Sequence, residues 1–281
     1  MKNNYPIYVI SKGRAKSCLT ARELKLMSVD FRLVVEPQEY EDYKDIAENI
    51  LVTPFSNLGE GSIPVRNWVW EHSIKEGHKR HWVLDDNIEG FHRLNMNEKP
   101  KLLSGTFFRC MEDFTDRYEN VGLSGANYYS FCKSTDKVPP YYLNTRIYSC
   151  ILIKNDLPHR WRGRFNEDTD LSIRVLKDGM CTILFNAFLI GKVTTMRMKG
   201  GNTEEIYGNT NNRKEFAESL QMQHPDIVKV TWKFNRWHHH VDYRPFKKNK
   251  LIRKQNLIIE NDIYKMKLLW KAQLVTLAYV I

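Results

Sequence analysis

Short apolar runs alternate with amphipathic stretches through most of the chain, at the spacing typical of β-α-β units. The apolar runs predict strands over residues 6–10, 32–35, 50–53, 81–84, 121–128, 147–153 and 181–189. The amphipathic stretches predict helices over residues 17–27, 40–48, 62–76, 105–119 and 164–177. This alternation indicates an α/β fold with a Rossmann-like, mainly parallel sheet flanked by helices.

The amino-acid composition changes near residue 191, which predicts a division of the chain into residues 1–195 and 196–281. Residues 197–213 are rich in Gly, Asn and Thr and are typical of a mobile loop. A short helix, a basic aromatic stretch and a charged helix over about residues 256–279 are expected to follow. We therefore expect a main α/β domain and a basic C-terminal extension.

Composition narrows the class of protein. The chain has 281 residues, 42% of them hydrophobic, which is typical of a globular protein and excludes disordered and fibrous classes. The longest uncharged apolar run, residues 272–281, is about half of the roughly 20 residues that a bilayer span needs, so no membrane anchor is expected. The five cysteines are widely spaced and no signal peptide precedes them, which predicts a reducing cytoplasm.

Positive charge is concentrated near the end of the chain. The formal net charge is +10, and residues 229–254 alone carry nine Lys or Arg and one acid, a local net charge of +8. Five aromatic residues lie among these cations: Trp232, Phe234, Trp237, Tyr243 and Phe246. Cations suit phosphates and aromatic faces suit unstacked bases, so we expect contact with nucleic acid. Alternatively, the aromatic side chains belong to the core and the cations form its solvated face.

Asp85, Asp86 and Asn87 directly follow the strand predicted over residues 81–84. Open α/β sheets bind ligands at the carboxyl ends of their strands. Two carboxylates and an amide at this position are hard oxygen ligands suited to Mg²⁺ or Mn²⁺ carrying a substrate diphosphate. The alternative is a strand-to-turn cap, because Asp and Asn favour turns.

A second acidic cluster, Glu167, Asp168 and Asp170, lies where a helix is expected to begin. Each of these acids alone is explained by helix capping or by the helix dipole. Two acidic clusters at the ends of regular elements in one domain are better explained together. One would bind the metal ion and the other would supply a general base.

Several cations and one histidine pair are further candidates. Lys12, Gly13 and Arg14 follow the first strand, and Arg66 lies at the head of a helix, where anions such as nucleotide phosphates are favoured. As isolated surface cations these residues would carry no function. His238 and His240 share one face of an extended segment and are candidates to hold a metal ion or a phosphate, or are polar surface residues.

Five segments together resemble the phage TET-associated glycosyltransferases, which have a GT-A type fold. They are Y-P-I-Y-V-I-S-K-G-R at 5–14, L-D-D-N at 84–87, N-E-D-T-D-L at 166–171, K-G-G-N at 199–202 and R-W-H-H-H-V-D-Y at 236–243. The resemblance covers nearly the whole chain. The metal element here is D-D-N, whereas the usual GT-A element is D-x-D.

The resemblance implies a role for each matched residue. Asp168, with Glu167 second, would deprotonate the acceptor. Donor binding would fall to Ser11, Lys12, Arg14, Arg66, Asp85, Lys199, Gly200, Gly201 and Asn202. Mn²⁺ or Mg²⁺ would be held by Asp86, Asn87, His238 and His240. The basic aromatic stretch, by its own composition, is expected to contact DNA through Lys233, Arg236, Trp237, His239, Arg244, Lys247 and Lys248.

The implied function is a metal-dependent, inverting transfer of sugar from a nucleotide-sugar, expected to be a UDP-sugar. The acceptor would be the hydroxymethyl group of 5-hydroxymethylcytosine, or a related pyrimidine, in phage DNA within the cytoplasm of an infected bacterium. The sequence leaves two alternatives open. One is a glycosyltransferase acting on lipopolysaccharide or protein, and the other is a metal-dependent nuclease or nucleic-acid binding module.

Overall fold

The computed structural model describes residues 3–133, 135, 137–193, 200 and 213–255. Most of the loop predicted over residues 197–213, including Lys199, Gly201 and Asn202, lies outside the described residues. The helix predicted over residues 256–279 lies outside them as well.

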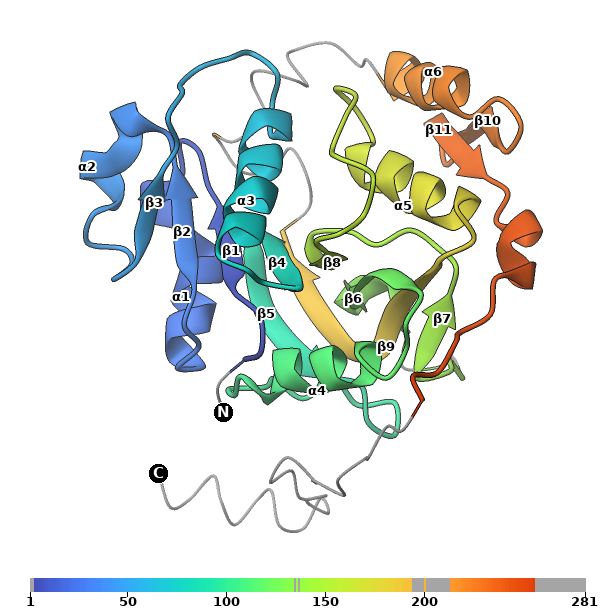
Figure 1. The fold of residues 1–281 in the computed structure, drawn as a ribbon, viewed down its shortest axis with the longest axis horizontal. Coiled ribbons are helices and arrows are strands. Elements are labelled where there is room, and N and C mark those ends of the chain that lie inside the picture. Colours follow the sequence, from blue (N-terminus) through green and yellow to red (C-terminus); the bar gives the residue numbers. More distant parts are fainter. Residues whose placement is uncertain (1–2, 134, 136, 194–199, 201–212, 256–281) are drawn as a thin grey trace.

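A nine-stranded sheet forms the centre of the molecule, in the order β3-β2-β1-β4-β8-β6-β9-β5, with β7 also paired to β9 (Figure 1). The strands are β1 Ile7–Ile10, β2 Arg32–Val35, β3 Ile50–Val52, β4 Arg80–Asp85, β5 Ile88–Arg93, β6 Val121–Tyr128, β7 Tyr141–Leu143, β8 Cys150–Lys154 and β9 Cys181–Lys192. β1, β2, β3, β4, β6 and β9 run in one direction, and β5, β7 and β8 run against them. The prediction of a mainly parallel α/β sheet is confirmed.

Helices cover both faces of this sheet (Figure 1). Those packed on it are α1 Leu19–Leu26, α3 Ile63–Lys75, α4 Thr106–Thr115 and α5 Glu167–Lys177, and α2 Tyr40–Tyr43 lies near one edge. Alternate side chains along a strand point to opposite faces, so β1 supplies Ile7 and Val9 to the core under α1 and α4. Tyr8 points to the other face and joins the core under α3 and α5. Among the described residues, no helix is both long and apolar enough to cross a membrane.

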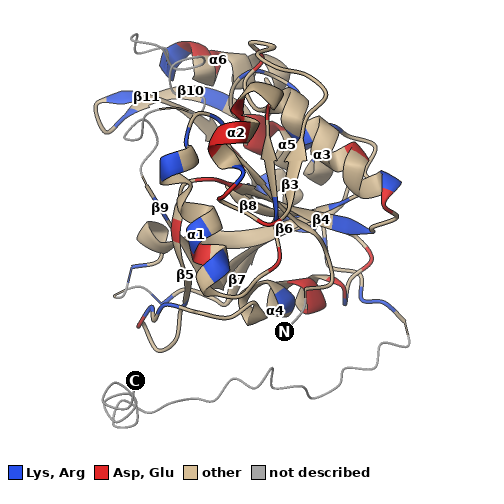
Figure 2. Ribbon diagram, turned by 90° about the vertical axis from the view of Figure 1, so that its left-hand side faces the viewer, with Lys and Arg blue, Asp and Glu red and all other residues tan. Residues whose placement is uncertain are grey.

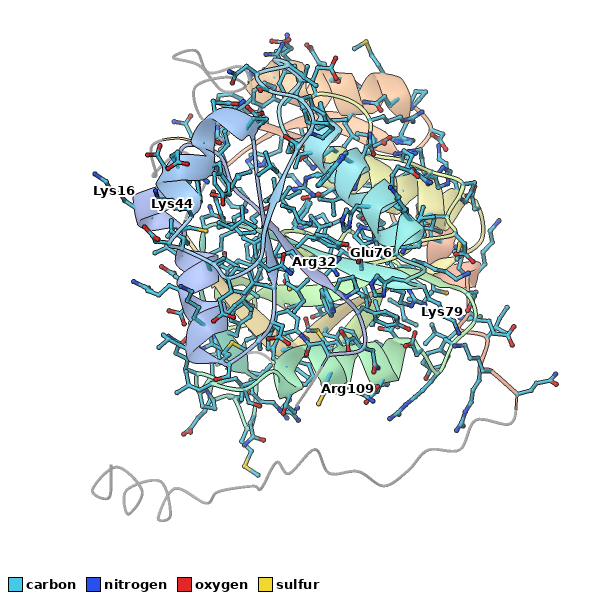
Figure 3. All side chains as sticks on the ribbon, turned by 60° about the vertical axis from the view of Figure 1, so that its left-hand side comes forward. Lys16, Arg32, Lys44, Glu76, Lys79 and Arg109 are labelled. Carbon is cyan, nitrogen blue, oxygen red and sulfur yellow. The ribbon has the colours of Figure 1, made fainter. Side chains whose placement is uncertain are left out.

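An ion pair fixes the far end of α3 to the sheet. Arg32, at the start of β2, pairs with Glu76, which follows the last turn of α3 (Figure 3). Arg32 also donates a hydrogen bond of 2.7 Å to the hydroxyl of Tyr8 in β1. The helix that carries Arg66 in its first turn is therefore held against two strands.

Two strands were absent from the sequence prediction, and one helix is shorter than predicted. β5 and β7 were not expected, and the helix predicted over residues 40–48 is regular only over Tyr40–Tyr43. Gly90 in the middle of β5 weakens the local preference for a strand, which here depends on antiparallel pairing with β9. β9 itself continues to Lys192, three residues beyond the predicted end.

The described C-terminal part packs on the outer side of α5. It comprises α6 Arg213–Gln223, the antiparallel hairpin of β10 Val228–Lys233 and β11 Arg236–Val241, and the 3-10 helix η5 Arg244–Lys248. Positive φ angles at Phe234 and Asn235 form the two-residue turn of the hairpin. Leu220, Val228 and Phe246 form a small core with residues of α5, so this part of the chain is tied to the helix that begins with the second acidic cluster.

Candidate active site

The Asp85-Asp86-Asn87 turn lies at the carboxyl edge of β4 and is held by the start of α1. Thr20 donates a hydrogen bond of 2.5 Å from its hydroxyl to the Asp85 carbonyl, and its backbone N–H donates one of 3.1 Å to the Asp86 carbonyl. The Thr20 hydroxyl also accepts a hydrogen bond of 2.9 Å from the backbone N–H of Ile88. These three bonds fix the direction in which the acidic side chains leave the strand.

Asp85 lies between two cations. One carboxylate oxygen is 3.1 Å from the Arg66 guanidinium and the other is 2.5 Å from the Lys192 ammonium. Burial alone would raise the pKa of Asp85, but the attraction of Lys192 and Arg66 outweighs it and lowers the pKa well below its usual range. Asp85 is therefore an anion at neutral pH.

Arg66 links the two acidic clusters. Besides Asp85, its guanidinium lies 3.0 Å from Asp168 and 3.9 Å from Glu167, and it stacks 4.5 Å from the centre of the Trp161 ring. The hydroxyl of Ser62, the residue before α3, makes no capping hydrogen bond with the helix; it accepts one from Arg66. One buried cation thus contacts both the carboxylate at the end of β4 and the predicted base.

The pKa of Asp168 differs strongly from that of an ordinary aspartate. Burial, together with repulsion from Glu167 and Asp85, outweighs the attraction of Arg66 and raises the pKa of Asp168 to about 7. A carboxylate with such a pKa is poised to take up and release a proton near neutral pH, which is what a general base requires.

Asp86 belongs to a neighbouring group of contacts. Its two oxygens accept hydrogen bonds of 2.8 Å from the Ser11 hydroxyl and 2.6 Å from Arg14. Arg14 also donates a bond of 2.9 Å to the carbonyl of Gly200. Gly200 has a φ of +77°, and an added Cβ there would lie 2.4 Å from the Gly13 carbonyl, so only glycine fits this contact. Lys12 lies to one side and pairs with Glu36.

Ser11, Arg14, Arg66, Asp85, Asp86, Glu167, Asp168 and Lys192 together form what we call the charged cluster. Its members come from the ends of β1, β4 and β9 and the starts of α3 and α5. Residues 5–201 match the family described as TET-Associated Glycosyltransferase. The chain belongs to this family. It is therefore a glycosyltransferase, an enzyme that takes sugar from a nucleotide-sugar donor to an acceptor.

Other comparisons add little to this assignment. No curated protein matches the sequence of this glycosyltransferase. A solved structure titled as a mannose-1-phosphate geranyltransferase from Thermus thermophilus is similar at 11% identity with a TM-score of 0.32. The match covers 67% of the glycosyltransferase and 57% of that chain.

Asn87 is the residue of this turn whose side chain fits a divalent ion, since both carboxylate oxygens of Asp86 accept hydrogen bonds from Ser11 and Arg14. The Oδ1 atom of Asn87 is buried and has no hydrogen-bond partner among the described residues. Within the described part of the chain, no group of three or more His, Cys, Asp or Glu side chains is arranged to hold a metal ion. Mg²⁺ is commonly held by one or two protein oxygens together with substrate phosphates. The turn fits an ion shared with a donor diphosphate.

The histidine triplet lies on β11. His238 lies within 2.9 Å of Arg236 and edge-on to Phe234, while His240 is paired across the hairpin with Lys229. His239 is half-buried, and burial followed by the charge of Arg146 lowers its pKa to about 4, so it is neutral at physiological pH. The interactions described for His238 and His240 lie within the hairpin and its surroundings, and none of them is with Asp86.

The other predicted DNA contacts divide between exposed and packed positions. Lys233, Arg236, Arg244, Lys247 and Lys248 are exposed, and Figure 2 marks Lys and Arg positions along the hairpin. Trp237 is half-buried and packs edge-on against Trp232. Of the other aromatic residues, Phe246 is a core residue, whereas Trp232 and Phe234 are 54% and 87% exposed. The aromatic residues of this stretch are therefore divided between the core and the surface, and their contact with nucleic acid stays a prediction.

Asp170, the third acid of the second cluster, is a structural residue. It is fully buried and bonded to His224, Arg162 and Arg174 at 2.9, 3.1 and 2.8 Å. Burial alone would raise its pKa, but these partners outweigh burial and lower it to about 2. Asp170 thus anchors the first turn of α5, the turn that carries Asp168.

Replacing Asp170 by Asn should lower the free energy of unfolding by about 3 kcal/mol, because the largely buried Arg174 loses its counter-charge. Thermal and urea unfolding measure this loss. Asp226→Asn is the matched control, since its ion pair with Lys177 is largely exposed and should contribute about 0–1 kcal/mol. Equal, small effects of the two substitutions would contradict the anchoring role.

Sequence reasoning missed Lys192 and Ser149. Lys192 ends β9 and donates to both Asp85 and the Ser149 hydroxyl, at 2.5 and 2.7 Å. The signal that could have found Lys192 is the one that found Asp85, a charged residue that directly follows a buried apolar strand. The predicted end of this strand at residue 189 hid that signal.

Proposed function

We propose that this glycosyltransferase transfers a sugar from a UDP-sugar, with inversion, to the hydroxymethyl group of 5-hydroxymethylcytosine or a related hydroxymethylpyrimidine in phage DNA. The single observation that carries the proposal is the bridge formed by Arg66. It joins Asp85, at the ligand-binding edge of the sheet, to Asp168, the carboxyl whose pKa is raised to about 7. A donor site and a base are thereby held side by side.

The donor half of the reaction needs positive charge near the diphosphate. Arg14, Arg66 and Lys192 supply it, and each is held by a carboxylate at the same edge of the sheet. Mg²⁺ or Mn²⁺ held by Asp86 and Asn87 would neutralise negative charge on the departing diphosphate when bound. The carbonyl of Gly200 accepts a hydrogen bond from Arg14, so Gly200 lies on the donor side of the site.

The acceptor half needs a base, because a primary hydroxyl is a poor nucleophile at neutral pH. Asp168 takes the hydroxymethyl proton, and the oxygen attacks the anomeric carbon of the sugar. The bond from this carbon to the diphosphate oxygen breaks, and UDP leaves with the bonding electrons. Attack on the face opposite the leaving group inverts the anomeric centre. General-base catalysis of this kind contributes about 10²–10⁴-fold.

DNA is favoured as acceptor by the excess of Lys and Arg over residues 229–254. Such a concentration of cations suits a polyanion far better than a neutral glycan or an ordinary protein surface. We place the reaction in the cytoplasm of an infected bacterium, because the proposed acceptor, phage DNA, is located there.

DNA affinity should depend steeply on salt concentration. The double substitution Lys247→Gln with Lys250→Gln should reduce the slope of log Kd against log salt concentration by about 2, because each lysine neutralises one phosphate. Fluorescence anisotropy with labelled duplex measures both quantities. The control is Lys44→Gln with Lys79→Gln, two exposed lysines elsewhere on the surface (Figure 3). A flat salt profile for the unmodified protein would instead favour lipopolysaccharide or protein as acceptor.

Release of UDP tests the proposed reaction. The enzyme is incubated with a UDP-sugar and Mn²⁺, alone, with plain DNA and with hydroxymethylated DNA. We expect release above the acceptor-free rate only with hydroxymethylated DNA, and its loss when EDTA is added. Equal release in all three mixtures for every UDP-sugar would overturn the proposal, and DNA cleavage without donor would indicate a nuclease.

A further inference from the structure

A pocket of about 400 Å³ lies beside the charged cluster, and five of its twelve lining residues are aromatic. We call it the aromatic pocket; the residues that matter here are Tyr128, Phe131, Tyr142, Arg146, Tyr148 and Tyr243. The rings of Tyr128 and Tyr148 lie 6.1 Å apart and are inclined by only 23°, and Phe131 meets Tyr128 edge-on at 5.1 Å. Arg146 lies 5.2 Å from the centre of the Tyr148 ring. Such walls suit a flat, polar ring.

Two walls of the aromatic pocket are bonded to residues that adjoin the charged cluster. The Tyr148 hydroxyl lies 3.0 Å from the hydroxyl of Thr169, the residue after Asp168. The Tyr128 hydroxyl lies 2.7 Å from that of Ser149, which accepts a hydrogen bond from Lys192. The pocket therefore lies next to both the predicted base and the cation that holds Asp85.

A basic groove continues from the aromatic pocket. This cavity of about 810 Å³ shares Leu143, Asn144 and Tyr243 with the pocket. Its cations are Lys229, Arg244, Lys247 and Lys250. Its two acids are already paired, Asp226 with Lys177 and Asp242 with Arg244. The groove therefore has net positive charge, as a path for phosphates requires.

The rim of the aromatic pocket is unusually apolar for a solvated surface. Phe131 and Tyr142 are 56% and 41% exposed, and both line the mouth. Aromatic side chains left exposed beside a cavity commonly mark a binding site. Their location between a basic groove and a candidate base selects a nucleobase as the occupant.

We infer that the aromatic pocket is the acceptor subsite, which holds one pyrimidine turned out of the DNA helix while the basic groove follows the adjoining phosphates. This inference rests on the proposed function and adds that the base is unpaired during transfer. A base stacked in the duplex would present its hydroxymethyl group from the major groove, but its ring would be unable to reach the tyrosine faces. An unpaired base stacks on such faces with little regard to sequence.

Binding experiments test the aromatic pocket without any turnover. Anisotropy compares a fully paired duplex with one in which the hydroxymethylcytosine faces a mismatched base, which is easier to turn out. We expect the unmodified protein to bind the mismatched duplex about tenfold more tightly. Phe131→Ala and Tyr142→Ala should each lose most of this preference. Equal affinity for the two duplexes in the unmodified protein would overturn the inference.

Tyr129→Ala is the matched control. Tyr129 is 40% exposed, almost the same as Tyr142, but its ring contacts His92 and Lys99 and it does not line the pocket. It should keep the preference for the mismatched duplex, and a loss equal to that of Tyr142→Ala would overturn the assignment of the pocket.

Steady-state transfer separates this inference from the proposed function and from a donor site. Phe131→Ala and Tyr142→Ala should raise the KM for DNA about tenfold and leave the KM for the UDP-sugar unchanged. A rise in donor KM alone would assign the pocket to the donor base and overturn the inference. If the protein kept its preference for the mismatched duplex but transferred no sugar, the proposed reaction would be contradicted. The assignment of the aromatic pocket to an unpaired base would still be supported.

Discussion

Asp168→Asn should lower kcat for sugar transfer by about 100-fold or more, because the amide is unable to accept the acceptor proton. The donor should still bind, since Asp85, Asp86 and their cations are unchanged. Rapid-quench kinetics measure the chemical step, and calorimetry measures donor affinity. Normal rates would remove Asp168 from the role of base.

Glu167→Gln is the matched control for this substitution. Glu167 precedes Asp168 in the same helical turn but lies 3.9 Å from Arg66, against 3.0 Å for Asp168. We expect Glu167→Gln to lower kcat for sugar transfer by less than about tenfold. A larger loss for Glu167→Gln than for Asp168→Asn would exchange the two roles.

The same carboxyl should set the pH dependence of transfer. Only deprotonated Asp168 accepts a proton, and burial raises its pKa to about 7. The rate should therefore rise with pH through about 7 and level off above it. The residual activity of Asp168→Asn should lack this rise of the rate with pH. A rate that is independent of pH between 5 and 8 in the unmodified enzyme would contradict the assignment of Asp168 as the base.

Arg66→Lys should lower kcat/KM by about 10–100-fold although the charge is retained. Lysine is a single point charge and is unable to reproduce the planar fork that contacts both Asp85 and Asp168. With weaker attraction from residue 66, the pKa of Asp168 should rise, so the ascending limb of the pH–rate profile should move to higher pH.

Arg160→Lys serves as the control, because Arg160 also stacks on a tryptophan and pairs with an acid, but on the surface. Its kcat/KM should remain within about twofold of the unmodified enzyme. If Arg66→Lys also left kcat/KM within about twofold of the unmodified enzyme, the bridge between Asp85 and Asp168 would have no part in catalysis.

Local sequence pattern was sufficient to find much of the fold and part of the candidate site. The strand before Asp85 and the helix that opens at Asp168 both follow from apolar periodicity interrupted by acids. Arg66 was expected at a helix start, and α3 places it there. In each case the signal lies within a few residues of the group it predicts.

Features that depend on contacts distant in the sequence were not predictable. The reverse direction of β8, which brings Ser149 to the edge where β4 ends, leaves no mark in its own residues. The aromatic pocket combines residues of β6, η3 (Tyr129–Phe131) and β7 with Tyr243, more than a hundred residues after Tyr128. A run of tyrosines is typical of ordinary core until the fold places the rings beside a base.

The histidine triplet is a conspicuous motif whose members the fold places in different surroundings. An isolated strand would present His238 and His240 together, and this alone suggested a metal site. In the hairpin, His240 faces the basic groove, while His238 contacts Arg236, a poor neighbour for a cation. The metal-ligand roles of these two histidines and those of Asp86 and Asn87 stay predictions.

The most direct measurement of the central claim is the mass of the modified nucleoside. Hydroxymethylated and plain DNA are incubated with UDP-sugar and Mn²⁺, digested to nucleosides and analysed by mass spectrometry. We predict that hydroxymethyldeoxycytidine gains the mass of one sugar and that unmodified deoxycytidine gains none. Unchanged hydroxymethyldeoxycytidine, with every UDP-sugar tried and with enzyme shown to bind both substrates, would contradict the account.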